Sequence, residues 1–228
     1  LSIRRQRQMC IRDSFKGANA LSGLGIKTIG IPGTIDNDMG YTDYTIGFFT
    51  AIETVSDAIG KLRDTSSSHG RAVVIEVMGR NCGDLALYSG LAGGGESIIV
   101  PEHEFSIEDI VAKMEHGRKR GKLHHLITLA EGVGDPYSIA HELEEKTGIE
   151  TKVTVLGHVQ RGGTPSSVDR LLGSTMGARA VELLLDEQTD LAIGYVDGKL
   201  IEVSIEEAVS KKSQFDESLY ELANNLSK

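Results

Sequence analysis

Several features that would place a protein in a special class are scarce or missing here. Only two of the 228 residues are cysteines, Cys10 and Cys82, so neither a disulfide framework nor a cysteine metal cluster is expected, and the cytoplasm is the expected location. No apolar run approaches the roughly 18 residues of a membrane span, so no membrane association is expected. Acidic residues outnumber basic ones by 33 to 24, which argues against general nucleic-acid binding.

Apolar residues and glycine are plentiful. The apolar share of 39% is enough to build a core, and 27 glycines indicate many tight turns or backbone that approaches a ligand closely. The length suits one domain or two small lobes.

The first thirteen residues differ from the rest of the chain. The segment LSIRRQRQMCIRD carries four arginines against one aspartate, with neither strand alternation nor a helical stripe. No apolar stretch follows it, so a secretory signal is not expected. It resembles a translated sequencing adapter, and we predict a foreign or disordered leader over residues 1–13.

From residue 26 onward, strands and helices alternate. The pattern predicts strands over 26–31, 72–78, 97–100, 124–129 and 153–156, and helices over 46–62, 82–91, 106–120, 137–146 and 166–185. The segments Ser106–Asp109 and Ser166–Asp169 resemble capping boxes. This alternation predicts βαβ units and a mostly parallel sheet, in which ligands bind beyond the carboxyl ends of the strands.

The turn after the first strand carries two carboxylates. In Pro32-Gly33-Thr34-Ile35-Asp36-Asn37-Asp38, the two aspartates could supply a general base and a metal-linked or orienting acid. Either aspartate could equally cap the following element, and the spacing alone favours neither interpretation.

Two further strand ends each carry one charged candidate residue. At 78–84, Arg80 could clamp an anion between two glycines, although the segment alone slightly favours an ordinary turn with a surface arginine. At 130–134, the acid Glu131 is by itself most simply a turn residue.

The last strand end, at 156–164, combines His158, Arg161 and flanking glycines ahead of a capped helix, which favours phosphate capture. Acids, arginines and a histidine at successive strand ends predict an enzyme with an anionic substrate. Phosphoryl transfer fits best, because its catalysis is mainly positioning and charge neutralisation.

Five segments resemble the bacterial 6-phosphofructokinases: GIPGTIDND at 30–38, RDTSSSHGR at 63–71, VIEVMGRNCGD at 74–84, AEGVG at 130–134 and TVLGHVQRGGTPSSVDR at 154–170. The resemblance runs from about Ser14 to the C-terminus. It implies an α/β phosphofructokinase fold with two Rossmann-like three-layer lobes and mostly parallel sheets. It also implies Mg²⁺-dependent transfer of the ATP γ-phosphoryl group to the 1-hydroxyl of fructose 6-phosphate, in glycolysis.

The resemblance also implies a division of the chain into two lobes and a role for each of several residues. Residues 14–47 and 160–210 would form the nucleotide-binding lobe, and residues 48–159 and 211–228 the sugar-phosphate lobe. Asp36 would be the catalytic base, Arg80 the residue that stabilises transition-state charge, and Thr34 would lie at the transferred phosphoryl group. The substrate-binding residues would include Asp38, Met78, Gly79, Glu131, His158 and Arg161.

Two more cationic positions imply a homotetramer. Arg71 and Lys152 match family residues that reach into a neighbouring subunit's site. Lys152 is a departure, because family members commonly carry arginine there, and lysine lacks the bidentate fork. The resemblance further implies an allosteric site for ADP and phosphoenolpyruvate, formed with Arg63, Glu96, Arg120 and Lys122.

Upstream of Ser14 the resemblance ends. Where the family's GGDGS motif should run, Arg12 stands in the place of the aspartate, and a cation cannot hold Mg²⁺. An aspartate at position 13 is similar to pyrophosphate-dependent relatives, whereas Gly33 favours ATP, because those relatives usually carry lysine there.

We therefore expect an ATP-dependent kinase. A pyrophosphate-dependent enzyme and a non-catalytic fragment that binds sugar phosphate or effector are the alternatives. With the family's N-terminal loops absent, the chain alone is expected to show no kinase activity and poor solubility. An N-terminal part ending in GGDG, in place of residues 1–13, should restore activity.

Overall fold

The computed structural model describes residues 10–227, which form two compact units. Of the described residues, unit 1 contains 10–48 and 165–214, and unit 2 contains 49–164 and 215–227. The lobes predicted from the sequence divide between residues 47 and 48, between 159 and 160 and between 210 and 211.

Unit 2 is built on a four-stranded parallel sheet with strand order β5-β6-β4-β7. Its strands are β4 (Ala72–Val77), β5 (Ser97–Ile99), β6 (His125–Ala130) and β7 (Thr151–Val155). The strand β6 is buried along its whole length, and β4 is buried except at Glu76. Burial on both faces explains why these strands read as continuous apolar runs rather than as alternating ones.

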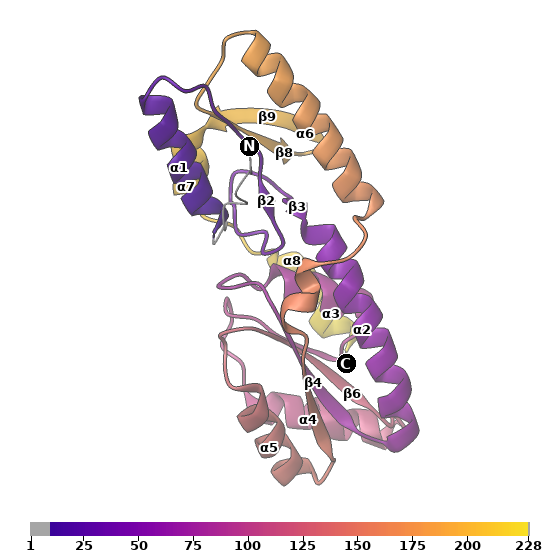
Figure 1. Cartoon of the computed structure of the whole chain (residues 1–228). Helices are drawn as coiled ribbons and strands as arrows, with labels where there is room; N and C mark the ends of the chain where they lie inside the picture. Colours follow the sequence, from indigo (N-terminus) through magenta and orange to yellow (C-terminus); the bar gives the residue numbers. More distant parts are fainter. Residues whose placement is uncertain (1–9, 228) are drawn as a thin grey trace. The chain divides into compact units, whose positions relative to one another are not determined.

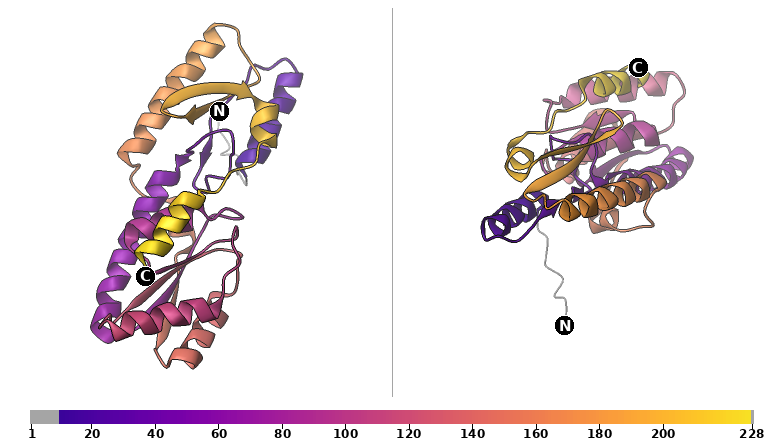
Figure 2. Two further views of the ribbon diagram at one scale, coloured as in Figure 1. Left: turned by 180° about the vertical axis from the view of Figure 1, so that it is seen from behind. Right: turned by 90° about the horizontal axis from the view of Figure 1, so that it is seen from above.

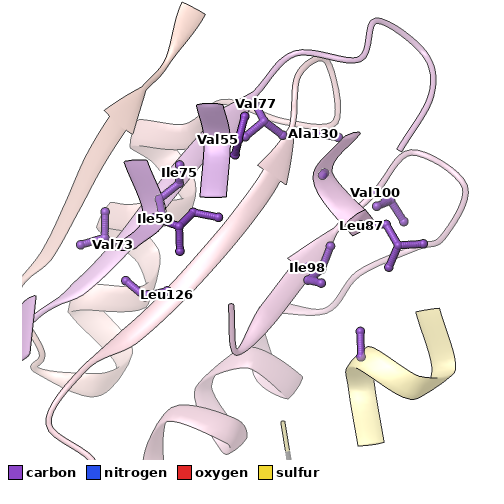
Figure 3. Packing of buried hydrophobic residues seen from close by; sticks show 12 residues of the cluster. Val55, Ile59, Val73, Ile75, Val77, Leu87, Ile98, Val100, Leu126 and Ala130 are labelled. Carbon is purple, nitrogen blue, oxygen red and sulfur yellow. The ribbon is translucent and has the colours of Figure 1, made fainter. Parts of the chain in front are cut away.

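Helices cover both faces of this sheet and make unit 2 a three-layer structure (Figure 1). The helices α2 (Phe48–His69), α3 (Asp84–Gly93) and α8 (Glu217–Leu226) pack on the face of Val73, Ile75 and Val77. Figure 3 shows part of this core, including Val55 and Ile59 of α2 beside β4. The helices α4 (Ile107–Lys119) and α5 (Pro136–Thr147) pack on the opposite face, against Ala72 and Val74.

Unit 1 also has three layers. Its sheet has the order β1-β8-β9, formed by β1 (Ile29–Gly30), β8 (Leu191–Val196) and β9 (Lys199–Ser204). Helix α6 (Ser167–Leu185) packs on one face, and α1 (Ile11–Gly23) and α7 (Ile205–Ser210) pack on the other (Figures 1 and 2). A separate parallel pair joins β2 (Gly33–Thr34) to β3 (Ile46–Gly47).

The serine N-caps predicted at two helix starts are confirmed. The Ser106 hydroxyl accepts the Asp109 amide at 3.3 Å, and the Ser166 hydroxyl accepts the Asp169 amide at 3.1 Å. The mostly parallel α/β architecture is confirmed as well. The antiparallel pair β8–β9 was not predicted; its turn at Asp197 and Gly198 has positive φ at both residues, as a type I′ hairpin requires.

Some predicted boundaries are wrong. The strand expected over 26–31 is only Ile29–Gly30, because its partner β8 begins at Leu191, opposite Ile29. The helix expected over 46–62 starts at Phe48, since Ile46 belongs to β3, and it continues to His69.

The predicted leader divides at residue 10. Residues 1–9 lie outside the described residues. Ile11, Arg12 and Asp13 form the start of α1 and are therefore ordered, while a foreign origin of the leader stays a prediction. The Ile11 side chain is buried with Phe15, and the Arg12 guanidinium donates to the carbonyl of Val209 at 2.6 Å. Among residues 10–227, no helix has the length and apolarity needed to cross a membrane.

Candidate functional site

The carboxylate turn of unit 1 is closed by hydrogen bonds. The Thr34 hydroxyl accepts the amide of Asp36 at 3.2 Å, and the Thr34 carbonyl accepts the Thr45 hydroxyl at 2.8 Å. These bonds hold the backbone of Asp36 against the β2–β3 pair. Asp36 is half-buried.

The residue between the two aspartates anchors the turn. Asn37 is buried and has φ 53°, a left-handed conformation that asparagine tolerates better than most residues. Its Oδ1 accepts the amide of Thr45 at 3.0 Å, and its Nδ2 donates to the carbonyl of Asp43 at 3.2 Å. Asp36 and Asp38 therefore flank a residue whose side chain is held by hydrogen bonds to the backbone. No role for Asn37 was predicted from the sequence.

The turn offers a metal ion two carboxylates at most. Asp38 Oδ1 is enclosed and has no hydrogen-bond partner among the described residues. Nowhere in residues 10–227 do three His, Cys, Asp or Glu side chains gather into a metal cage. Such a donor set fits Mg²⁺, which is commonly bound by one or two carboxylates together with substrate phosphates and water.

A second turn, in unit 2, follows β4 and carries Arg80. Gly79 has φ 144° and Arg80 has φ 60°, so both backbones are outside the usual region for L-residues. A Cβ at position 79 would overlap the carbonyl oxygen of Cys82, which explains the glycine. The Arg80 side chain is exposed at this turn.

Glu131 holds that turn in place. Its amide continues the β4–β6 ladder by donating to the Val77 carbonyl at 2.8 Å. Its Oε1 accepts the amide of Arg80 at 2.7 Å and that of Gly79 at 3.3 Å. Burial, and then the carboxylates of Glu131 and Asp135, raise the pKa of neighbouring Glu76. Glu131 thus has a structural partner that its sequence context did not indicate.

The His158–Arg161 segment forms a short 3₁₀ helix, η1 (Gly157–Arg161), directly after β7. His158 and Arg161 are exposed, whereas Gln160 between them is 1% exposed. The strands β4 and β7 are neighbours in the sheet, so the Arg80 turn and η1 leave it side by side at its carboxyl end. Unit 2 therefore brings together Met78, Gly79, Arg80, Glu131, His158 and Arg161.

Arg71 and Lys152 lie at the opposite end of the same sheet. Arg71 immediately precedes β4, and Lys152 is the second residue of β7. The six residues of β4 rise by roughly 3.3 Å each, which separates Arg71 from the Arg80 turn by about 20 Å. Both cations pair with Glu150, Lys152 at 2.7 Å, and they lower the pKa of that carboxyl, Lys152 first.

The four expected effector residues all belong to unit 2. Glu96 is buried and pairs with Lys122 at 2.7 Å, while its other oxygen accepts the amide of Leu126. Arg63 donates to the carbonyl of Gly93. Lys122 and Arg120 line a cavity of about 330 Å³ that is also lined by His116. The structure thus brings Glu96 and Lys122 into direct contact, and Arg120 lines the same cavity as Lys122.

Comparisons with known proteins find a matching family model, similar sequences and similar folds. Residues 12–184 match the family model described as phosphofructokinase. A relative from Finegoldia magna, named ATP-dependent 6-phosphofructokinase, is 68% identical over 94% of this chain and 67% of its own length. A Clostridium tetani relative of the same name is 60% identical over the same shares. A solved phosphofructokinase from Saccharomyces cerevisiae is 32% identical with a TM-score of 0.80, over 88% of this chain and 30% of that one.

Proposed function

The chain belongs to the phosphofructokinase family, and on that premise we propose that it acts as an ATP-dependent 6-phosphofructokinase, which converts fructose 6-phosphate to fructose 1,6-bisphosphate in glycolysis. One observation carries the proposal. The Arg80 turn and the η1 helix leave neighbouring parallel strands at their carboxyl ends, where α/β sheets bind ligands.

Asp36 is the base of the proposed reaction. Its carboxylate accepts the proton of the sugar 1-hydroxyl, and the hydroxyl oxygen bonds to the γ-phosphorus. The bond from that phosphorus to the β–γ bridging oxygen breaks, and its electron pair leaves with ADP. The bonds to Thr34 and Asn37 fix the turn that carries Asp36 before substrate arrives, so little reorganisation is needed in the transition state.

Arg80 neutralises charge on the transferring phosphoryl group, and Thr34 lies beside that group. Mg²⁺, held by Asp38 together with the phosphates of ATP, would supply further charge neutralisation. Gly33 remains the sequence feature that favours ATP over pyrophosphate, and the names of the curated relatives agree with that choice.

The sugar phosphate is bound by unit 2. Arg161 and His158 are exposed donors suited to the 6-phosphate, and Met78, Gly79 and Glu131 line the sugar. In this proposal unit 2 is the sugar-phosphate lobe and unit 1 belongs to the nucleotide-binding lobe.

Arg71 and Lys152 serve the site of a neighbouring subunit in a homotetramer. Their position about 20 Å from the Arg80 turn, the length of one six-residue strand, supports this role because neither side chain is long enough to reach the turn of its own chain. The group of Arg63, Glu96, Arg120 and Lys122 binds ADP or phosphoenolpyruvate as effectors. The proposed location is the cytoplasm.

The test is a coupled assay at saturating ATP, Mg²⁺ and fructose 6-phosphate. Two proteins are assayed: the chain itself, and a hybrid in which residues 1–13 are replaced by the N-terminal part of the Finegoldia magna relative. In whichever protein turns over, Asp36→Asn keeps the shape and removes the base, so kcat should fall by at least about 100-fold with little change in sugar affinity.

The matched control is Asp186→Asn, an exposed aspartate of unit 1 at the end of α6, which should leave kcat unchanged. Near-normal turnover of Asp36→Asn would refute its role as base. Absence of turnover in both the chain and the hybrid would refute the proposed activity.

A further inference from the structure

Gln160 stands out in the η1 helix because it is the only buried residue of that helix. Its side chain is 1% exposed, while the adjacent Val159 is 65% exposed and Arg161 is also exposed. A buried carboxamide needs partners at both of its ends, because an unpaired polar group away from water is costly.

Both partners are backbone groups, and they belong to the two turns of the proposed sugar-phosphate site. Gln160 Oε1 accepts the amide of Met78 at 3.1 Å, and Gln160 Nε2 donates to the carbonyl of Gly157 at 3.0 Å. A backbone amide can only donate and a backbone carbonyl can only accept, so the orientation of the side-chain amide follows from its neighbours.

The Gln160 side chain connects the two chain segments just beyond the last backbone hydrogen bond between β4 and β7. The Leu156 amide donates to the Glu76 carbonyl at 3.2 Å, which is the last backbone bond between the chains of β4 and β7. Beyond it, one chain turns into Met78, Gly79 and Arg80, and the other turns into η1. The Gln160 side chain supplies the next connection between them.

We propose that Gln160 is a positioning residue that sets the spacing between the Met78–Arg80 turn and the His158–Arg161 segment. The inference rests on the proposed function, because it assigns Gln160 to the binding of fructose 6-phosphate. Gln160 touches no substrate. It fixes the distance between the backbone that lines the sugar and the cations that bind its phosphate.

The experiment compares Gln160→Met and Gln160→Glu with the unsubstituted chain. Methionine has a similar length and makes neither hydrogen bond. Glutamate keeps the acceptor for the Met78 amide and regains the donor only when it is protonated. Gln188→Met is the matched control, since Gln188 is an exposed glutamine of unit 1.

Calorimetry with fructose 6-phosphate is the first readout. We expect Gln160→Met to weaken binding by about 10-fold or more, as loss of a buried hydrogen-bond partner does. Gln160→Glu should be weakened at pH 8 and should recover towards the unsubstituted affinity at pH 6, measured relative to the unsubstituted chain at each pH. Gln188→Met should bind normally.

Hydrogen exchange of the Met78 amide is the second readout, and it does not depend on sugar binding. Gln160→Met should exchange this amide at least about 10-fold faster, whereas Gln160→Glu should keep it protected. A purely stabilising role for Gln160 would instead lower the melting temperature of Gln160→Met without changing the dissociation constant.

The outcomes separate this inference from the proposed function. If neither the unsubstituted chain nor the hybrid with the relative's N-terminal part binds fructose 6-phosphate, the proposed function is wrong and this inference falls with it. If either binds it and Gln160→Met in the same protein binds equally well, or its Met78 amide stays protected, only the inference about Gln160 is overturned.

Discussion

The same substitution, glycine to alanine, should have opposite effects at two positions of unit 2. Gly79 lies in the Arg80 turn with φ 144°, whereas Gly60 lies inside helix α2. An added Cβ meets no atom within 4 Å at Gly60, but at Gly79 it overlaps the backbone oxygen of Cys82. We predict that Gly79→Ala destabilises the chain and that Gly60→Ala stabilises it.

The size of the Gly79→Ala effect follows from what the turn would lose. A non-glycine residue held at this φ costs about 1–3 kcal/mol. The Cys82 oxygen cannot move aside freely, because the Cys82 amide donates to the Gly79 carbonyl at 2.9 Å. Relief by rotation of the turn would weaken the bonds of Glu131 to the Gly79 and Arg80 amides, so the total loss is about 3–5 kcal/mol.

Gly60→Ala should instead gain about 0.5–1 kcal/mol, the difference between alanine and glycine inside a helix. Thermal unfolding followed by circular dichroism compares the two variants with the unsubstituted chain. For a chain of this length we expect the melting temperature to fall by roughly 10 °C for Gly79→Ala and to rise by about 2 °C for Gly60→Ala. A Gly79→Ala melting temperature within about 2 °C of the unsubstituted value would refute the reasoning.

The other predictions concern binding and pH. Arg161→Ala and His158→Ala should each weaken fructose 6-phosphate by about 10–150-fold in calorimetry, because each removes an interaction with a charged group, and unchanged affinity in both would contradict the site. Burial lowers the pKa of His125 from 6.5 to about 4. At a pH between these two pKa values, the unfolded chain therefore binds a proton at His125 that the folded chain does not. The free energy of unfolding should therefore fall as pH drops from 6.5 to 4, by up to about 1.4 kcal/mol per pH unit. Denaturant titrations at several pH values should show a flatter dependence for His125→Gln, and an equal slope would exclude this histidine as the cause.

The sequence predicted most accurately those elements whose signals are local. The strand β4 is a buried apolar run, and helices α4 and α6 begin at serine caps whose partners lie three residues away. Both kinds of signal act within a few residues, so they can be recognised without knowledge of the fold.

The elements that were misplaced depend on distant partners. The strand β1 is short because β8, far along the chain, meets it only at Ile29 and Gly30. The β8–β9 hairpin did carry a local signal, the Asp197-Gly198 dipeptide between two strand-like segments, which the sequence analysis did not use.

In the candidate site, too, some features have local sequence signals and others depend on distant partners. Residues at strand ends, such as Arg80 and His158, could be chosen from the sequence because parallel strands bring their carboxyl ends together. The bonds from Glu131 to the Gly79 and Arg80 amides and from Gln160 to the Met78 amide join segments 50 or more residues apart, and no local pattern indicates them. Their detection requires the three-dimensional structure.

The division of the chain into two interleaved units has a consequence for its synthesis on the ribosome. Unit 1 needs residues 165–214 to complete its sheet, and unit 2 needs residues 215–228 to complete its core. Helix α8, yellow in Figure 2, contacts α3 and β5, and its Ala223 is buried with Val73 and Ile75 of β4. A nascent chain that has already exposed residues 49–164 must therefore keep an apolar face of α3 and β5 uncovered until residues 215–228 emerge. Residues 49–164 of unit 2 are therefore completed only by a segment that is translated after the second part of unit 1. Nascent chains need protection from aggregation until residues 215–228 have emerged, and a nonsense mutation near residue 215 would leave the core of unit 2 incomplete.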